Sequence, residues 1–305
     1  MKLLKGKSYI YRMKKIAISV FITSLLLASC KKDEVLQNEI TFTAVTYNVA
    51  GLPEGISHSH PQLYSSSISP LLNDYDIIHL QEDFCYHDSI LLYDHHPYRT
   101  ATTGCVPEGS GLNGLSNFKI SNIDRISWND CNGADCLTPK GFYYSQITLL
   151  NNDKVDFYDV HCNAGSNDAS SAARRGNIAQ LCNYIQTHSA GTPVIIMGDF
   201  NSRYTRDIDT IRAILGLGFK DVWVELVRSG VVPDISPDNL DECEPIRTYV
   251  NCERVDKIFY RGNDNFEITP LSYHVDDDRF YYQGNDTLQL SDHWPVFVTF
   301  NIKRK

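Results

Sequence analysis

The sequence predicts an α/β fold in which two face-to-face β-sheets are covered by helices on their outer sides. Strand-like apolar segments alternate with two or three helix-like segments along the chain. One segment, PVIIMGDFN, is a continuous apolar run that stops at Gly and Asp, which is typical of a strand buried on both faces. Such a strand needs a layer on each side, so a second sheet and flanking helices are expected.

The individual elements follow from local patterns. Residues 40–49 alternate apolar and polar side chains as a half-buried strand does. Residues 141–150 and 154–161 form a hairpin around the polar turn NND. Residues 169–188 place Ala, Ile and Leu at helical spacing. The remaining expected elements are helices at 61–75 and 206–215 and strands at 76–80, 193–199, 254–260 and 294–300.

Residues 1–30 are expected to be a targeting segment, residues 31–39 a tether, and residues 40–305 one folded domain. Lys14 and Lys15 precede the apolar run IAISVFITSLLLAS, which is too short to span a bilayer and is typical of a secretory signal. The stretch LLASC resembles a bacterial lipobox, which implies a lipidated Cys30 and membrane attachment through it. The next residues, KKDE, resemble the export signal of Bacteroidota lipoproteins, so we expect an outer-membrane lipoprotein of the cell envelope, periplasmic or surface-exposed. An ordinary signal peptide is the alternative.

Cysteine usage and charge narrow the class of protein. Nine cysteines leave eight after Cys30, and in an exported chain they indicate disulfides before metal ligands. Cys131/Cys136 and Cys243/Cys252 are the pairs most easily proposed. The first thirty residues hold six Lys or Arg and no acidic residue, so the remainder has a net charge of −15. A chain of that charge does not attract polyanions over its whole surface, so nucleic acid is not favoured as a partner.

Polar side chains follow the predicted strands at the point where each strand ends. A carboxylate in that position avoids burial without a partner, and several strands can direct their ends to one place. The side chains concerned are Asn48, Gln81, Glu82, Asp159, His161, Asp199, Asn201, Asp256, Asp292 and His293. Taken singly, most of them could equally close turns or pair on the surface.

The ordered segments TYNV, QED, DVH, GDFN, RVDKI and SDHWP resemble the endonuclease/exonuclease/phosphatase superfamily over residues 41–302. This group includes pancreatic-type deoxyribonucleases, apurinic endonucleases, inositol-polyphosphate 5-phosphatases and bacterial sphingomyelinases. The resemblance implies a four-layer α/β sandwich with two packed, mainly antiparallel sheets. It also implies a Mg²⁺-dependent hydrolase acting on phosphoester bonds, with Mn²⁺ or Ca²⁺ as alternatives.

The resemblance implies a role for each strand-end residue. Glu82, Asn48 and Asp292 are expected to bind the metal, which suits the preference of Mg²⁺ for oxygen ligands. His293 is expected to activate water or stabilise the phosphate, and Asp256 to hold His293 in one tautomer. The other implied roles are water orientation or deprotonation by Asp199, a hydrogen bond to phosphate from Asn201, and protonation of the leaving group by His161.

The positions of four arginines in the sequence predict what their side chains contact. Arg203 and Arg206 follow GDFN, where their guanidinium groups could grip an anionic group of the substrate or pair with acidic neighbours. Arg174 and Arg175 are expected to face solvent on the 169–188 helix. The acidic run at 276–278 is expected to be a solvated loop rather than a calcium site.

Four observations bear on the substrate class. Apurinic endonucleases carry an acid where this chain has Ala50, and NVAGLP resembles a segment of bacterial sphingomyelinases. With the acidic charge and the expected lipid anchor, these favour a monomeric phosphodiesterase acting on a phospholipid or another small phosphodiester. A deoxyribonuclease-like endonuclease, an inositol-phosphate phosphatase and a non-catalytic surface-binding lipoprotein remain the alternatives.

Overall fold

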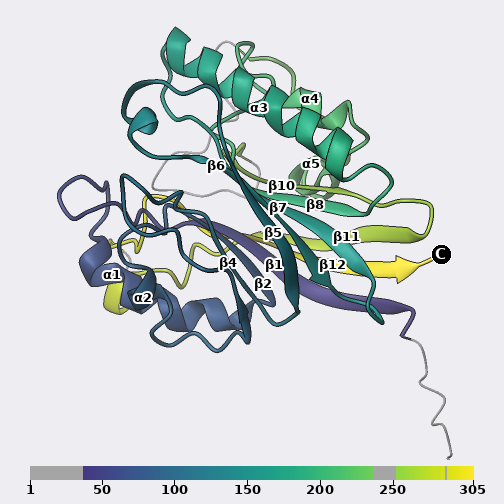
Figure 1. Cartoon of the computed structure of the whole chain (residues 1–305), viewed down its shortest axis with the longest axis horizontal. Coiled ribbons are helices and arrows are strands. Elements are labelled where there is room, and N and C mark those ends of the chain that lie inside the picture. The colour runs from purple at the N-terminus through teal and green to yellow at the C-terminus, as the bar shows by residue number, and fades with distance from the viewer. Residues whose placement is uncertain (1–36, 237–251, 286) are drawn as a thin grey trace, which may run out of the picture. The chain divides into compact units, whose positions relative to one another are not determined.

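Two six-stranded β-sheets form the centre of the part of the chain that the structure, a computed structural model, describes (Figure 1). The described residues are 37–236, 252–285 and 287–305. This arrangement confirms the two-sheet prediction. Within the described residues, no helix combines the length and the apolar composition needed to cross a membrane.

The first sheet is built around the parallel pair of β1 and β2. β1 is also antiparallel to β12, so the N-terminal and C-terminal strands lie side by side. In spatial order the strands are β11 (Phe266–Val275), β12 (Val296–Arg304), β1 (Glu39–Asn48), β2 (Ile77–Gln81), β4 (Asn113–Ser116) and β3 (Tyr98–Arg99).

The second sheet has a matching parallel pair, β7 and β8, and β8 pairs antiparallel with β10. All six residues of β8 are buried, as its continuous apolar sequence predicts. In spatial order the strands are β5 (Ile120–Ser127), β6 (Gly141–Thr148), β7 (Lys154–His161), β8 (Val194–Asp199), β10 (Asp256–Arg261) and β9 (Lys220–Asp221).

Helices cover the outer sides of both sheets (Figure 1). α3 (Asp168–His188) begins at Asn167, whose side chain accepts a hydrogen bond from the Ser170 backbone N–H, and packs with the larger hydrophobic core that joins the two sheets. The smaller core includes residues of β1, β2 and α1 (Pro61–Ile68). The other helical segments are η1 (Ser69–Asp74), α2 (His87–Ile90), η2 (Gly133–Leu137), α4 (Arg212–Leu215), α5 (Val222–Leu226) and η3 (Tyr282–Gly284).

Several local predictions were wrong. The helix expected at 206–215 is reduced to α4, and the whole edge strand β11 was missed. Arg174 does not face solvent, because its side chain is buried. The acidic run at 276–278 is not simply solvated either, since Asp276 is buried and pairs with Arg279.

The cysteine prediction is confirmed for one pair and wrong for two residues. Cys131 and Cys136 form a disulfide as expected, and Cys85 pairs with Cys105. The buried cysteines Cys162 and Cys182 are free thiols. Cys252 is disulfide-bonded, whereas Cys243, its expected partner, lies outside the described residues, as does Cys30.

Candidate active site

The polar strand ends of the two sheets meet in one place. In the first sheet Asn48 ends β1 beside Gln81, the last residue of the parallel strand β2. In the second sheet Asp199 ends β8 between His161 of β7 and Asp256 of β10. The Asn48 amide nitrogen lies 3.2 Å from the Asp199 carboxylate, so it joins the two sheets at this point.

Glu82 is held at the site by the turn that leaves β2. Its Oε1 accepts a hydrogen bond from the Asn48 amide at 3.2 Å. Its backbone has φ 56°, a left-handed conformation that non-glycine residues rarely adopt. The Glu82 carbonyl accepts from the Gly51 N–H at 2.9 Å, and a Cβ on Gly51 would lie 2.5 Å from that carbonyl oxygen. Gly51 therefore allows the two turns to approach each other and fixes the direction of Glu82.

His293 and Asp256 form a hydrogen-bonded dyad. Nδ1 of His293 lies 3.0 and 3.1 Å from the two Asp256 carboxylate oxygens. Burial alone would lower the pKa of His293, but the charge and hydrogen bond of Asp256, with the charges of Asp199 and Asp292, raise that pKa well above its usual value. The dyad leaves Nε2 of His293 directed at Asp199, with 3.8 Å between Nε2 and Oδ2.

Asp199 occupies the centre of the cluster. Burial and the nearby charge of Asp256 raise its pKa to about 6, while His293, Lys140 and the Asn201 backbone N–H act against that rise. The Asn201 N–H donates to Asp199 Oδ1 at 2.9 Å. The Asn201 side-chain amide donates to the Cys162 carbonyl at 3.1 Å, so in this structure it braces the turn after β8.

His161 is buried beside a lysine that the sequence did not suggest. Its Nε2 lies 3.5 Å from Asp199, 3.8 Å from Glu82 and 3.1 Å from the ammonium of Lys140. Burial and the positive charges of Lys140 and His293 lower the pKa of His161 well below its usual value. Lys140 precedes β6 and lies far from the strand-end motifs in sequence, so no pattern in the chain pointed to it.

The cluster offers a donor set suited to a hard divalent cation. Ligand atoms of Asp199, Asp256 and His293 lie within 4.8 Å of one another. Glu82 adds a further carboxylate, bridged to Asp199 by the Asn48 amide. Mg²⁺ is commonly held by one or two carboxylates together with water and substrate oxygens, so these residues fit such an ion.

Two predicted metal ligands are placed differently from the rest. The Oδ1 of Asn48 accepts a hydrogen bond from the Ala50 N–H at 3.0 Å, so its oxygen faces the backbone and its nitrogen faces the carboxylates. Asp292 is exposed, and its Oδ1 accepts a hydrogen bond from the Ser291 hydroxyl at 3.4 Å. Asp292 lies close enough to His293 for its charge to raise the pKa of that imidazole.

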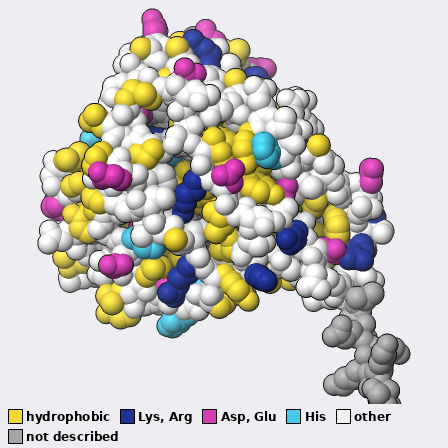
Figure 2. Space-filling model, viewed as in Figure 1, with side chains coloured by type: hydrophobic (Ala, Val, Ile, Leu, Met, Phe, Trp, Pro, Cys, Tyr) yellow, Lys and Arg dark blue, Asp and Glu magenta, His cyan; other side chains and the backbone are white. Residues whose placement is uncertain are grey.

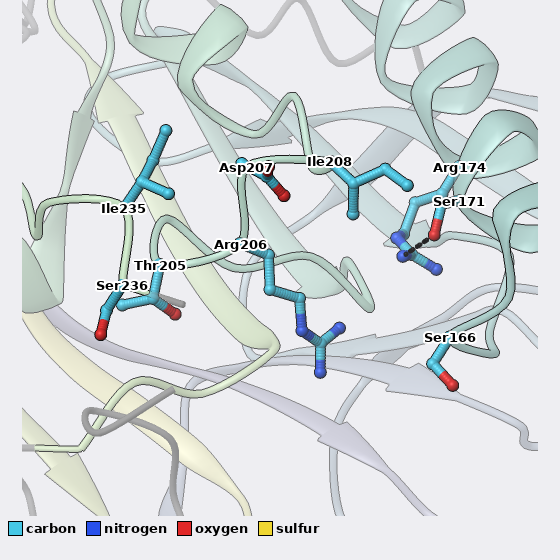
Figure 3. A pocket seen from close by; sticks show the side chains of 9 residues that line it. All are labelled: Ser166, Ser171, Arg174, Thr205, Arg206, Asp207, Ile208, Ile235 and Ser236. Atoms are coloured by element: carbon cyan, nitrogen blue, oxygen red, sulfur yellow. Dashed lines mark hydrogen bonds between the residues drawn. The ribbon is translucent and has the colours of Figure 1, made fainter. Parts of the chain in front are cut away.

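Of the two arginines predicted to bind substrate, Arg206 lines a neighbouring cavity, whereas Arg203 is not among the residues that line it. Arg206 lines a cavity of about 380 Å³ and extends into it in Figure 3. Its guanidinium is 3.8 Å from Asp209, which also accepts from Arg174 and from the Arg203 backbone N–H. Arg174 hydrogen-bonds Ser171 at the cavity wall (Figure 3). This cavity therefore adjoins the loops that follow β7 and β8.

Comparisons with known proteins agree with this geometry. A family model described as Endonuclease/Exonuclease/phosphatase family 2 matches residues 27–236. A sphingomyelinase of Mycobacterium tuberculosis is 36% identical over 270 residues, covering 85% of this chain and 52% of the relative. The chain thus spans about half the length of the curated relatives it matches.

Solved structures show the same fold at lower identity. A beta toxin from Staphylococcus aureus with bound magnesium ions superposes with a TM-score of 0.58 at 16% identity, covering 85% of this chain and 99% of the toxin chain. D. rerio TDP2 complexed with a single-strand DNA product gives a TM-score of 0.59 at 18% identity, with coverages of 85% and 98%.

Proposed function

Because the chain belongs to the endonuclease/exonuclease/phosphatase family, we propose that it is a metal-dependent phosphodiesterase acting on a phospholipid or another small phosphodiester. One observation carries the proposal. Asp199 lies between the His293–Asp256 dyad and the Asn48–Glu82 pair, within reach of both. A phosphate held there would lie beside His293, which can donate a hydrogen bond, and beside Asp199, which can accept a proton.

The side chains have complementary tasks in this proposal. Asp256 accepts from Nδ1 of His293, so the imidazolium Nε2–H donates to a non-bridging phosphate oxygen. Asp199 takes the proton of the attacking water, and its pKa of about 6 suits a base that works near neutral pH. The water oxygen forms the new bond to phosphorus, the ester P–O bond breaks, and the leaving oxygen takes up a proton from solvent to become an alcohol.

Glu82 would hold the metal through its carboxylate, with Asp292 as the further ligand predicted from the sequence, while the Asn48 amide nitrogen orients Glu82. When bound, Mg²⁺ would neutralise a phosphate oxygen and stabilise the leaving oxygen. The match with a sphingomyelinase supports a phospholipid-type substrate. On the face shown in Figure 2, Lys and Arg side chains lie in separate patches among Asp and Glu, so that face offers no continuous basic strip for a nucleic-acid backbone.

The test is a substrate panel measured with the purified protein and Mg²⁺. Bis-p-nitrophenyl phosphate and sphingomyelin are expected to be hydrolysed, and EDTA or His293→Ala is expected to reduce the rate by at least about 10²-fold. Cleavage of plasmid DNA alone would identify an endonuclease, and release of phosphate from an inositol polyphosphate alone would identify a phosphatase. Tight binding without turnover on the whole panel would identify a non-catalytic binding protein.

We also propose that Cys30 is lipidated and attaches the protein to the bacterial outer membrane. The proposal rests on the sequence LLASC after an apolar run. In cells, the protein is expected in the membrane fraction, and Cys30→Ala is expected to move it to the soluble fraction. Equal membrane association of the two forms would contradict the proposal.

A further inference from the structure

Lys140 places a positive charge beside the carboxylate cluster, and none of the tasks above uses it. Its ammonium is 3.1 Å from Nε2 of His161, and its side chain is only 10% exposed. His161 in turn is 3.5 Å from Asp199, the proposed base. Lys140 is thus one imidazole away from the centre of the site, and its charge also acts on the titration of Asp199.

The loop before β6 is built so as to hold this lysine in place. Asp135 Oδ1 accepts from the Lys140 ammonium at 2.7 Å, while Oδ2 accepts from the Ala164 backbone N–H at 2.5 Å. Asp135 lies within the loop closed by the Cys131–Cys136 disulfide. The same loop is attached to the segment after β7 by the Asn132 N–H, which donates to Asn163 Oδ1 at 2.7 Å. The lysine is therefore pre-positioned rather than free to sample solvent.

The contact also determines what His161 can do. An ammonium has only donors, so Nε2 of His161 must accept, and the ring proton must reside on Nδ1. That Nδ1 is buried with no hydrogen-bond partner among the described residues. A neutral His161 in this tautomer has no proton on Nε2 to give to a leaving group. The predicted role of His161 as the acid therefore fits the geometry less well than a role in orienting Lys140.

We propose that Lys140 is a catalytic residue that binds a non-bridging oxygen of the substrate phosphate, and that His161 and Asp135 are positioning residues that hold its ammonium. The inference rests on the proposed function, since it assumes that a phosphate occupies the cluster. The Lys140 ammonium offsets the negative charge that Glu82 and Asp199, both within 3.8 Å of His161, would otherwise present to the incoming phosphate.

The test compares Lys140→Met and Lys140→Arg with the wild-type protein. Lys140→Met keeps the length of the side chain and removes the charge, so kcat for the phosphodiester that the wild type hydrolyses is expected to fall by about 10²–10³-fold. Its Kd for inorganic phosphate, measured by calorimetry, is expected to rise at least tenfold. Lys140→Arg, which keeps the positive charge, is expected to retain part of the wild-type kcat and part of the phosphate affinity. Lys154→Met is the matched control, because Lys154 is exposed at the opposite end of β7.

A second readout does not depend on activity. The ¹⁵N shifts of His161 are expected to report a proton on Nδ1 in the wild type and a shift toward the Nε2 tautomer in Lys140→Met. If Lys140→Met does not fold, Asp135→Asn, which keeps the lysine but removes its anchor, is expected to raise the Kd for phosphate about tenfold.

Four outcomes separate the two proposals. An active wild type with Lys140→Met within twofold of it in kcat would overturn the role of Lys140, and so would a wild type that binds no inorganic phosphate at millimolar concentration. Unchanged phosphate affinity in Asp135→Asn would remove the positioning role of the loop. Phosphate binding that weakens in Lys140→Met while the wild type hydrolyses nothing would support Lys140 and refute the phosphodiesterase.

Discussion

Replacement of Asp256 by Asn tests the His293 dyad directly. Two opposite charges 3.0 Å apart attract by roughly 5 kcal/mol at an effective dielectric constant of about 20, which is an upper limit for a partly solvated pair. A close opposite charge more commonly shifts a pKa by about 1–3 units, so Asp256→Asn is expected to lower the pKa of His293 by that amount. Because Asp256→Asn also removes the charged acceptor that orients His293, kcat is expected to fall by about 10²–10⁴-fold.

The assay is an NMR titration of His293 in both forms, together with the pH dependence of hydrolysis. The raised pKa of His293 in the folded protein contributes stability that is fully present below about pH 6.5, its unfolded value, and is lost as pH rises through the folded pKa. The wild type should therefore exceed Asp256→Asn in stability most clearly in the acidic range. Asp264→Asn, an exposed site, is the control. Identical titration of His293 in wild type and Asp256→Asn would refute the dyad.

Three further perturbations have defined outcomes. Because protonation of Asp199 removes a negative charge beside the proposed metal ligand Glu82, Mg²⁺ affinity measured by calorimetry is expected to rise with pH through about 6, by up to about tenfold per unit below it. Gly51→Ala would force its new Cβ against the Glu82 carbonyl, so both the melting temperature and Mg²⁺ affinity are expected to fall. Arg174→Ala leaves the buried Asp209 without its closest charge partner and should cost about 3–5 kcal/mol in urea unfolding, whereas Arg206→Ala, at 3.8 Å and 26% exposed, should cost less than about 1 kcal/mol.

Each of these has a contrary result. Mg²⁺ affinity independent of pH between 5 and 7 would show that the charge of Asp199 does not influence metal binding. A Gly51→Ala protein with wild-type affinity for Mg²⁺ would show that the turn can move without displacing Glu82. Equal losses of stability for the two arginines would contradict the difference in burial on which that prediction depends.

The sequence predicted the strand ends well because their signal is local. A strand such as β8 is continuously apolar and then stops at an acid, and both features lie within nine residues. The order of such ends along the chain carried the family resemblance, and the two-sheet fold follows from it. Lys140 was missed because its role depends on a neighbour twenty-one positions away, across the hairpin of β6 and β7.

The wrong predictions share a physical cause, which is that tertiary contacts override local pattern. Arg174 is one of several polar residues in the first turns of α3, so helical spacing alone suggested exposure. In the fold Arg174 is buried, and its guanidinium donates hydrogen bonds to the carboxylate of Asp209, which lies in the loop after β8. β11 was missed because Pro270 interrupts the pattern, yet a bulge between Pro270 and Ser272 lets this edge strand accommodate the proline. Cys162 and Cys182 are held in the core as apolar groups and have no bonded partner.

Because the site is divided between two sheets, it is complete only in the folded domain. Asn48 and Glu82 belong to one sheet, while His161 and Asp199 belong to the other, and only the docked pair brings them within hydrogen-bonding distance. A chain in which only one sheet has formed therefore lacks part of the site. We therefore expect the proposed activity to appear only after β12 has paired with β1.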